Sequence, residues 1–159
     1  MRQRLRFGLL VFCTALLAAC GDGMVRRVSD PAARVQQLTV NMDGSWKVDL
    51  RLQNYSSIPM RYEGVRLDLD AGGEAAGVLQ LAPGISIGPE AADVVSVALR
   101  PSSAARIAVA DALAGHRSLE YTLKGSIDAT PEDNKKQRHF EIDTRNLLTP
   151  APGLDGVLR

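Results

Sequence analysis

The stretch from Gly84 to Gly88 carries the residue types that come nearest to a catalytic motif. It is Gly-Ile-Ser-Ile-Gly, the G-x-S-x-G pattern of a nucleophile elbow, in which a sharp strand-to-helix turn exposes a reactive serine. Here Pro89 follows at once and the next element is a Val-rich strand, while the two histidines, His116 and His139, lie in no alternating strand–helix pattern. A hydrolase that uses Ser86 is therefore kept only as a contrast. The sequence predicts no catalytic residue, no small-molecule substrate and a protein that is not an enzyme.

Carboxylates are the next candidates, because they could hold a cation. Asp68 and Asp70 lie two apart on one face of a strand-like run, with Glu63 and Glu74 nearby in the sequence. A Ca²⁺ site needs six or more oxygens that converge from a loop, and this arrangement supplies two along a strand. The sequence also lacks a Walker loop and a dinucleotide fingerprint. We expect no metal site and no cofactor.

The amino terminus has the layout of a secretory signal. Arg2, Arg4 and Arg6 precede an apolar run from Phe7 to Ala19, and no acidic residue occurs before Cys20. The run is shorter than the roughly 20 apolar residues that span a bilayer, so a retained membrane helix is the weaker alternative.

The residues at the end of this run set its chemistry. They are Leu17-Ala18-Ala19-Cys20, which resembles the lipobox of bacterial lipoproteins. The resemblance implies cleavage between Ala19 and Cys20, a diacylglycerol on the Cys20 thiol and acylation of the new amino terminus. The alternative is an ordinary signal in which Cys20 is only a small residue near the cut.

Charge and cysteine content then exclude several functions. The chain has 19 basic and 18 acidic residues, and removal of residues 1–19 leaves a net charge of −2. A mildly acidic domain without a clustered basic face is not expected to bind nucleic acid. Cys13 would leave with the signal and Cys20 would become a thioether, so the fold has to be held by its core without a disulfide.

Beyond the signal, the hydrophobic pattern has mostly period two. Trp46, Val48, Leu50 and Leu52 alternate with polar residues, which is typical of a half-buried strand. Asp43-Gly44 before this run predicts a hairpin, and a change of parity at Gly64 predicts a β-bulge.

Only the Ala-rich stretch from about 102 to 114 departs from the pattern. It begins with serine, spaces Ile107, Ala110 and Leu113 by three and ends at Gly115, which predicts a short helix. Seven or eight such strands favour an all-β fold, an antiparallel β-sandwich.

The order of these features is similar to that of the late embryogenesis abundant type 2 family, also called the WHy (water stress and hypersensitive response) domain. The features are Leu52-Gln53-Asn54, Ile58-Pro59-Met60, Gly72-Gly73, Ala76-Gly77, Ile87-Gly88-Pro89 and Tyr121-Thr122-Leu123-Lys124-Gly125. The family's Asn-Pro-Asn is represented only by Asn54, which Tyr55, Ser56 and Ser57 follow. The resemblance implies an immunoglobulin- or fibronectin type III-like sandwich without cofactor or catalytic residues, associated with desiccation and stress.

These observations give the chain four parts. They are a lipoprotein signal peptide at 1–19, the lipidated Cys20 with a flexible tether over 20–33, a WHy-like sandwich over 34–145 and an irregular tail over 146–159. The tail is expected either to fold back over a sheet edge or to serve as a docking segment. We expect a non-enzymatic envelope lipoprotein with a role in stress tolerance, or alternatively an adaptor that binds an envelope protein.

Contacts and location follow from the same parts. The membrane is the first expected partner, through the acylated Cys20. A protein partner is expected at Tyr55, Ile58, Pro59 and Met60, unless Tyr55 and Ile58 plug the end of the sandwich. Bacterial lipoproteins, which this amino terminus resembles, are retained at the inner membrane in many Gram-negative bacteria when Asp directly follows the acylated cysteine. This chain has Gly21 there, which favours the periplasmic face of the outer membrane of a Gram-negative bacterium.

Overall fold

The computed structural model describes residues 26–159, and over them the chain forms nine strands and one helix. The elements are β1 (Ala32–Val40), β2 (Trp46–Gln53), β3 (Met60–Ala71), β4 (Glu74–Leu81), β5 (Ile85–Ile87), β6 (Ala92–Leu99), α2 (Ser103–Ala114), β7 (Leu119–Pro131), β8 (Arg138–Leu148) and β9 (Val157–Leu158). The predicted signal peptide and the predicted lipidation of Cys20 concern residues outside this range. Within 26–159, no helix has the length and apolar character needed to cross a membrane.

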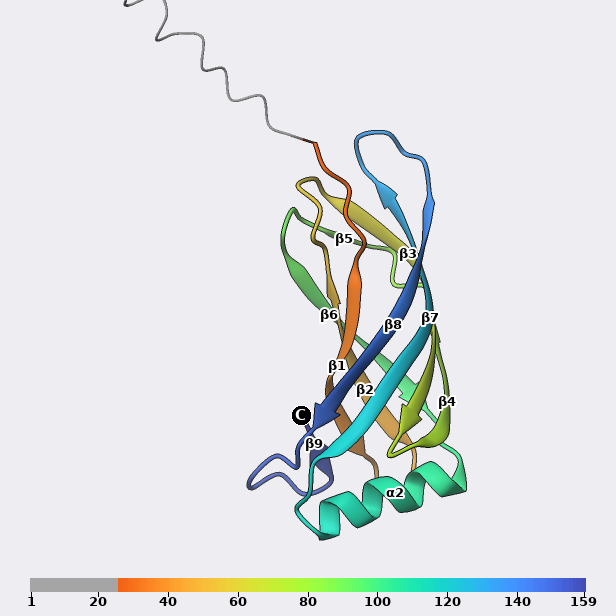
Figure 1. Ribbon diagram of the computed structural model, residues 1–159, viewed down its shortest axis with the longest axis vertical. Helices are drawn as coiled ribbons and strands as arrows, with labels where there is room; N and C mark the ends of the chain where they lie inside the picture. Colours follow the sequence, from red (N-terminus) through yellow and green to blue (C-terminus); the bar gives the residue numbers. More distant parts are fainter. Residues whose placement is uncertain (1–25) are drawn as a thin grey trace, which may run out of the picture.

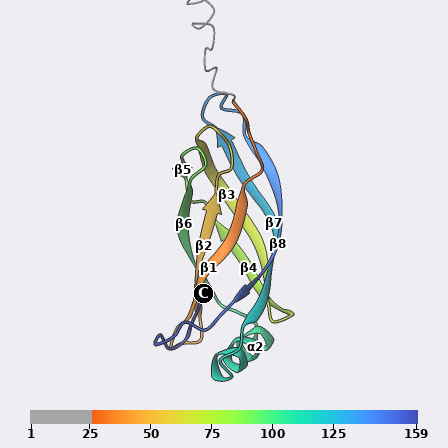
Figure 2. The same cartoon turned by 60° about the vertical axis from the view of Figure 1, so that its left-hand side comes forward.

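Two antiparallel sheets make up the domain (Figure 1). One sheet has the order β6-β2-β1-β9; the other has the order β4-β3-β7-β8, with β5 paired to β3 beside β4. Figure 2 shows β6, β2 and β1 on one side of the domain and β7 and β8 on the other. The predicted all-β sandwich with one short helix is confirmed. Eight strands lie where the alternation predicts them, and β9 is the addition.

The core lies between the sheets and is built by the alternating residues. Trp46, Val48, Leu50 and Leu52 in β2 are all fully buried, as period two requires of one strand face. The predicted hairpin also forms, and Gly44 there has a φ of +78°. Asp43 accepts hydrogen bonds from the Ser45 hydroxyl and amide, and the hydroxyl bond lowers the pKa of the Asp43 carboxyl.

Two bulges adjust the strands to this core. In β3 the register with β7 shifts between Tyr62 and Gly64, so Tyr62 and Val65 are both buried; the predicted bulge is confirmed. In β1 the register shifts between Val35 and Gln37, and the Val35 amide donates to the Tyr121 hydroxyl of the opposite sheet at 3.0 Å. Burial raises the pKa of Tyr121, which keeps the hydroxyl neutral in this contact between the sheets.

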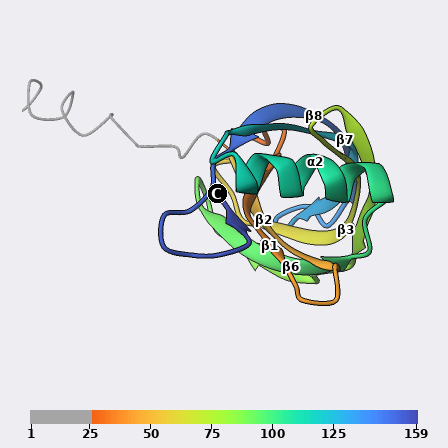
Figure 3. The same ribbon diagram turned by 90° about the horizontal axis from the view of Figure 1, so that it is seen from below.

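Helix α2 covers one end of the sandwich, which we call the helix end (Figure 3). Ser102 caps the helix, since its hydroxyl accepts from the Ala105 amide at 3.2 Å and donates to the Ala75 carbonyl at 2.7 Å. The predicted helix is confirmed. Its buried residues are Ala105, Val109 and Ala112, whereas Ile107 is 70% exposed. The helix lies close to the β3–β4 turn, so only small side chains fit on the helix face that packs against the sheets.

The carboxyl-terminal segment is more regular than expected. Strand β8 continues to Leu148, and Val157–Leu158 pair with Thr39 and Leu38 of β1. The predicted irregular tail over 146–159 is irregular between Leu148 and Val157 but not at its two ends, where Leu148 and Leu158 are buried in the core. Of the two expected roles, the structure shows the first: β9 covers the edge of β1, which would otherwise expose unpaired backbone groups.

Candidate functional site

The end of the sandwich opposite α2, called the loop end here, contains the most elaborate polar contacts of the domain. It consists of the N-terminal segment 26–31, the β2–β3 turn 54–59, the β5–β6 turn 88–91 and the β7–β8 loop 132–137 (Figure 1). Asn54 and Ser56, the two buried polar side chains of residues 26–159, both lie in the β2–β3 turn. Buried polar groups are retained where they are hydrogen-bonded, and these two are.

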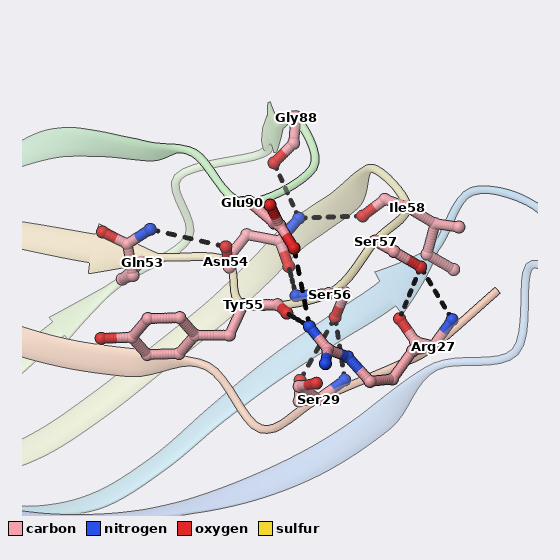
Figure 4. A network of polar contacts seen from close by, with 10 residues as sticks. All are labelled: Arg27, Ser29, Gln53, Asn54, Tyr55, Ser56, Ser57, Ile58, Gly88 and Glu90. Carbon is pink, nitrogen blue, oxygen red and sulfur yellow. Dashed lines mark hydrogen bonds and ion pairs between the residues drawn. The ribbon is translucent and has the colours of Figure 1, made fainter. Parts of the chain in front are cut away.

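Asn54 ties the two turns of the loop end together (Figure 4). Its Nδ2 donates to the carbonyls of Ile58 at 2.9 Å, Ile87 at 3.1 Å and Gly88 at 2.9 Å. Its Oδ1 accepts from the Ser56 amide at 2.8 Å. The first contact stays within the β2–β3 turn and the next two reach the strand and turn that lead into β6. One side chain therefore joins two of the four segments of the loop end.

Replacing Asn54 by alanine is expected to lower the free energy of unfolding by roughly 2–4 kcal/mol, because several buried backbone groups lose their partner at once. Chemical denaturation of both chains would measure the difference. Asn41 provides a matched control, since its amide donates to Ser45 in an exposed turn. Asn41→Ala should be close to wild type. Equal losses in the two variants would contradict the assigned network.

The N-terminal segment is bonded to the β2–β3 turn by a set of contacts that we call the N-terminal clasp (Figure 4). The Arg27 amide donates to Ser57 Oγ at 2.8 Å, and the Ser57 amide donates to the Arg27 carbonyl at 3.0 Å. The Ser29 amide donates to the buried Ser56 Oγ at 3.0 Å. The Arg27 guanidinium also donates to the Tyr55 carbonyl at 3.2 Å and lies 3.6 Å from Glu90.

The clasp corrects the predicted tether. Residues 20–33 were expected to be flexible, yet the chain is bonded to the domain from Arg27 onward, and Val28 packs against the core. The reason is that the hydroxyl groups of two serines in the turn accept hydrogen bonds from backbone amides of the N-terminal segment. The sequence of this segment shows no hydrophobic periodicity that would predict such contacts. Ala32 and Ala33 of the expected tether already belong to β1.

The four residues of the expected partner contact have different surroundings. Tyr55 is 52% exposed, whereas Ile58 is 8% and Met60 1% exposed, and Pro59 is half-buried. Ile58 and Met60 are therefore not available to a partner in the folded chain, and that part of the prediction is wrong. They fill the end of the core, as the alternative had it for Ile58. The Tyr55 ring points away from the polar network (Figure 4) and borders a shallow hollow beside Arg34 and Thr144.

A larger hollow of about 940 Å³, the loop-end cleft, lies on the outer side of β3. Its lining residues come from β3, the β4–β5 connection, the end of β7 and the β7–β8 loop: Arg61, Glu63, Ala82, Gly84, Thr130, Glu132, Lys135 and Gln137. Sequence reasoning missed this cleft, because its charged groups come from two segments far apart in the sequence, β3 and the β7–β8 loop. The one local signal was an arginine and a glutamate at alternate positions on the outward face of a strand.

The charged groups of the cleft differ in whether they have hydrogen-bond partners within the protein. Glu63 accepts from Thr130 at 2.9 Å and from Gln137 at 2.7 Å, and Glu132 accepts from the Ser86 hydroxyl at 2.6 Å. Arg61 and Lys135 make no side-chain hydrogen bond or ion pair within the described part of the chain. The cleft therefore presents two cations that are free to bind an anionic group, next to two carboxylates that are already hydrogen-bonded.

The G-x-S-x-G stretch does not form an elbow. Ser86 is the middle residue of the short strand β5, and the chain passes from Gly88 and Pro89 through a turn into β6. No helix N-terminus stands behind the serine, and its hydroxyl donates to Glu132. The motif has the conformation of an alternating strand paired with β3.

The carboxylates singled out for a cation also lie along a strand. Asp68 and Asp70 both belong to β3, and Asp70 accepts from the Thr122 hydroxyl at 3.1 Å. Over residues 26–159, no three His, Cys, Asp or Glu side chains gather in a way that could hold a metal ion.

His139 forms a small charged cluster on the outer face of β8. Its Nδ1 lies 2.7 Å from Asp128 Oδ1, and its Nε2 lies 3.3 Å from Glu141 Oε1. The hydrogen bond with Asp128 raises the pKa of His139 above its ordinary value of 6.5. The cluster is not among side chains of residues 26–159 that could together hold a metal ion, so it is a local electrostatic contact.

Titration of His139 gives a second prediction. Because its pKa is raised in the folded state, the stabilisation is complete below about pH 6.5 and is lost as the pH rises through the raised pKa. The difference in Tm between the wild type and His139→Gln should therefore shrink as the pH rises above about 6.5. An NMR titration of the imidazole should give a midpoint above 6.5, and Asp128→Asn should bring it down. A midpoint unchanged by Asp128→Asn would show that the contact does not form in solution.

Comparison with known proteins gives structural similarities at low identity and one family match. Three solved structures are similar at low identity: an Archaeoglobus fulgidus protein (12% identity, 79% of this chain and 98% of that one, TM-score 0.42), an Arabidopsis thaliana protein (14%, 87% and 93%, 0.47) and a late embryogenesis abundant protein (13%, 95% and 87%, 0.49). No curated protein sequence matches the chain. The family model of the late embryogenesis abundant proteins, group LEA_2, matches residues 49–146, from β2 to β8. The chain therefore belongs to the late embryogenesis abundant family.

Proposed function

We propose that this protein is a lipid-anchored lipoprotein of the cell envelope whose late embryogenesis abundant domain contributes to tolerance of drying and other stress without catalysing a reaction. One observation carries the anchor: Cys20 ends a lipobox-like stretch, and every described strand and helix lies after it, the first being β1 at Ala32. Cleavage before Cys20 would thus leave every described element intact. The stress role is supported by the family's association with desiccation.

The location follows from the residue behind the cysteine. Gly21 stands where an inner-membrane lipoprotein would have aspartate, so we place the protein on the periplasmic face of the outer membrane of a Gram-negative bacterium. Membrane fractionation would measure this. Recovery mainly with the inner membrane would contradict the location while leaving the anchor untouched.

Intact-mass spectrometry of the native protein tests the anchor directly. We expect a chain that starts at Cys20 and carries acyl groups, and a Cys20→Ser variant that lacks them. A retained Met1 or a free thiol at Cys20 would refute the anchor. Drying and osmotic challenge of a deletion strain test the role, with the Cys20→Ser strain as the comparison. Full survival of the deletion strain under both challenges would refute the stress role.

A second candidate, an adaptor for an envelope protein, is favoured by exposed apolar residues around the helix end. They are Met42, Ile107, Leu147 and Leu154. Removal of the chain after Thr144 would be a poor test, because it also removes buried Leu148 and Leu158. Photo-crosslinking in cells from position 107, with and without Leu154→Ser, is cleaner. A crosslinked protein that is lost in the variant would support an adaptor; the absence of any crosslink would count against it.

A further inference from the structure

The path from the proposed acylated cysteine to the folded domain is short. Arg26 follows Cys20 by six positions in the sequence, and at up to about 3.6 Å per position this stretch reaches at most ~22 Å. The clasp then bonds Arg27 and Ser29 to the β2–β3 turn. The lipid is thereby held close to the loop end.

The other end of the domain is out of reach of the same anchor. Strand β7 runs between the two ends and has 13 residues, which corresponds to about 40 Å at 3.3 Å per residue. This exceeds the reach of the connecting residues. An anchor at Cys20 consequently places the loop end, and not the helix end, next to the membrane.

We propose that the loop end lies on the bilayer surface and that the loop-end cleft binds a zwitterionic phospholipid headgroup, with its phosphate at Arg61 and Lys135 and its ammonium group at Glu63 and Glu132. This inference rests on the lipid anchor proposed above. It goes beyond that anchor because it assigns a ligand to a cleft and an orientation to the domain.

The charge of the cleft matches such a headgroup. Arg61 and Lys135 lack a partner within residues 26–159, and guanidinium and ammonium groups are the usual donors to phosphate. Each carboxylate keeps lone pairs beyond those used by Thr130, Gln137 and Ser86. Two free cations beside two acceptors fit a ligand that carries both signs of charge better than one that carries a phosphate alone.

The rim of the cleft does not oppose this binding. Two acidic residues beside the N-terminal segment are already paired: Asp133 lies 3.7 Å from Arg26, and Glu90 lies 3.6 Å from Arg27. Lys136, which is exposed in the same loop, adds a positive charge on the side that would face the lipid. A bilayer surface with phosphate groups therefore meets no uncompensated acid from these pairs.

Site-specific quenching on the full-length lipidated protein tests the orientation. Because Cys13 would be removed and Cys20 acylated, an introduced cysteine would be the only thiol. A fluorophore at Lys136→Cys is compared with one at Ile107→Cys, on vesicles of phosphatidylethanolamine and phosphatidylglycerol that contain a headgroup quencher. We expect strong quenching at 136 and little at 107. Equal quenching at both positions, or stronger quenching at 107, would overturn the orientation.

The headgroup contact is tested with charge-removing substitutions in the same assay. Arg61→Gln together with Lys135→Gln should reduce quenching at 136 several-fold, and so should vesicles of phosphatidylglycerol alone. Lys124→Gln together with Arg145→Gln, exposed cations elsewhere on β7 and β8, should have no effect. If the quenching at position 136 is the same with and without the charges of Arg61 and Lys135, the residues that connect Cys20 to the domain orient it without a headgroup contact. A protein that fails to float with the vesicles would instead refute the anchor, so the two failures are distinguishable.

Discussion

Aspartate in place of Leu50 is expected to leave the domain unfolded under conditions in which the wild type is folded. Leu50 is fully buried in the middle of β2 and pairs with Val35 of β1 and Val95 of β6. Burial of a leucine contributes about 1.5–3 kcal/mol, and an unpaired charge at the same position costs several kcal/mol more. Domains of this size are stable by only about 5–15 kcal/mol, so one substitution exhausts most of that margin.

Far-UV circular dichroism and thermal melting would measure the effect, and the same strand supplies a control. Arg51 is the next residue and lies opposite Arg34 on the outer face of the sheet. Arg51→Asp introduces the same side chain but places it beside a cation, so its Tm should stay near the wild-type value. A Leu50→Asp protein that melts like Arg51→Asp would mean that β2 does not present this face to the core.

Both substitutions depend on a periodicity that is visible in the sequence, and this explains how much of the fold could be predicted. Strands β2 and β3 each bury one face, so apolar residues occur at every second position of their sequences. The change of parity at Gly64 marks the bulge in β3. The helix was predictable from its caps at Ser102 and Gly115. These signals are local, because each arises within a few residues of the element that it specifies.

The features that sequence reasoning missed depend on contacts between distant segments. Asn54 and the serines after it have the composition of an exposed turn, and only the approach of the β5–β6 turn and of the N-terminal segment buries them. The loop-end cleft likewise needs the β7–β8 loop beside β3. The two-residue strand β9 is too short to show any period. The inward face of α2 is set by the closeness of the β3–β4 turn and not by the spacing of its larger residues.

Gly125 is a position where a local signal and a distant contact coincide. It closes the stretch Tyr121-Thr122-Leu123-Lys124-Gly125, part of the resemblance to the late embryogenesis abundant family, and it lies in the middle of β7 opposite Leu67 of β3. Its φ is +150°, a value that other residues rarely adopt. A Cβ at this position would lie 2.2 Å from the Arg66 carbonyl oxygen, which belongs to the backbone and cannot rotate away.

Gly125→Ala is therefore expected to lower the free energy of unfolding by roughly 3–5 kcal/mol, since the strained backbone and the forced shift of β3 add together. The Tm should fall by about 10–20 °C. Gly88→Ala is the matched control: no atom lies within 4 Å of its Cβ position and its φ is not in the positive range, so its Tm should change little. Equal stability of the two variants would mean that β7 and β3 do not approach each other as closely as described. A large difference would explain physically why a strand between two paired neighbours carries a glycine at this position.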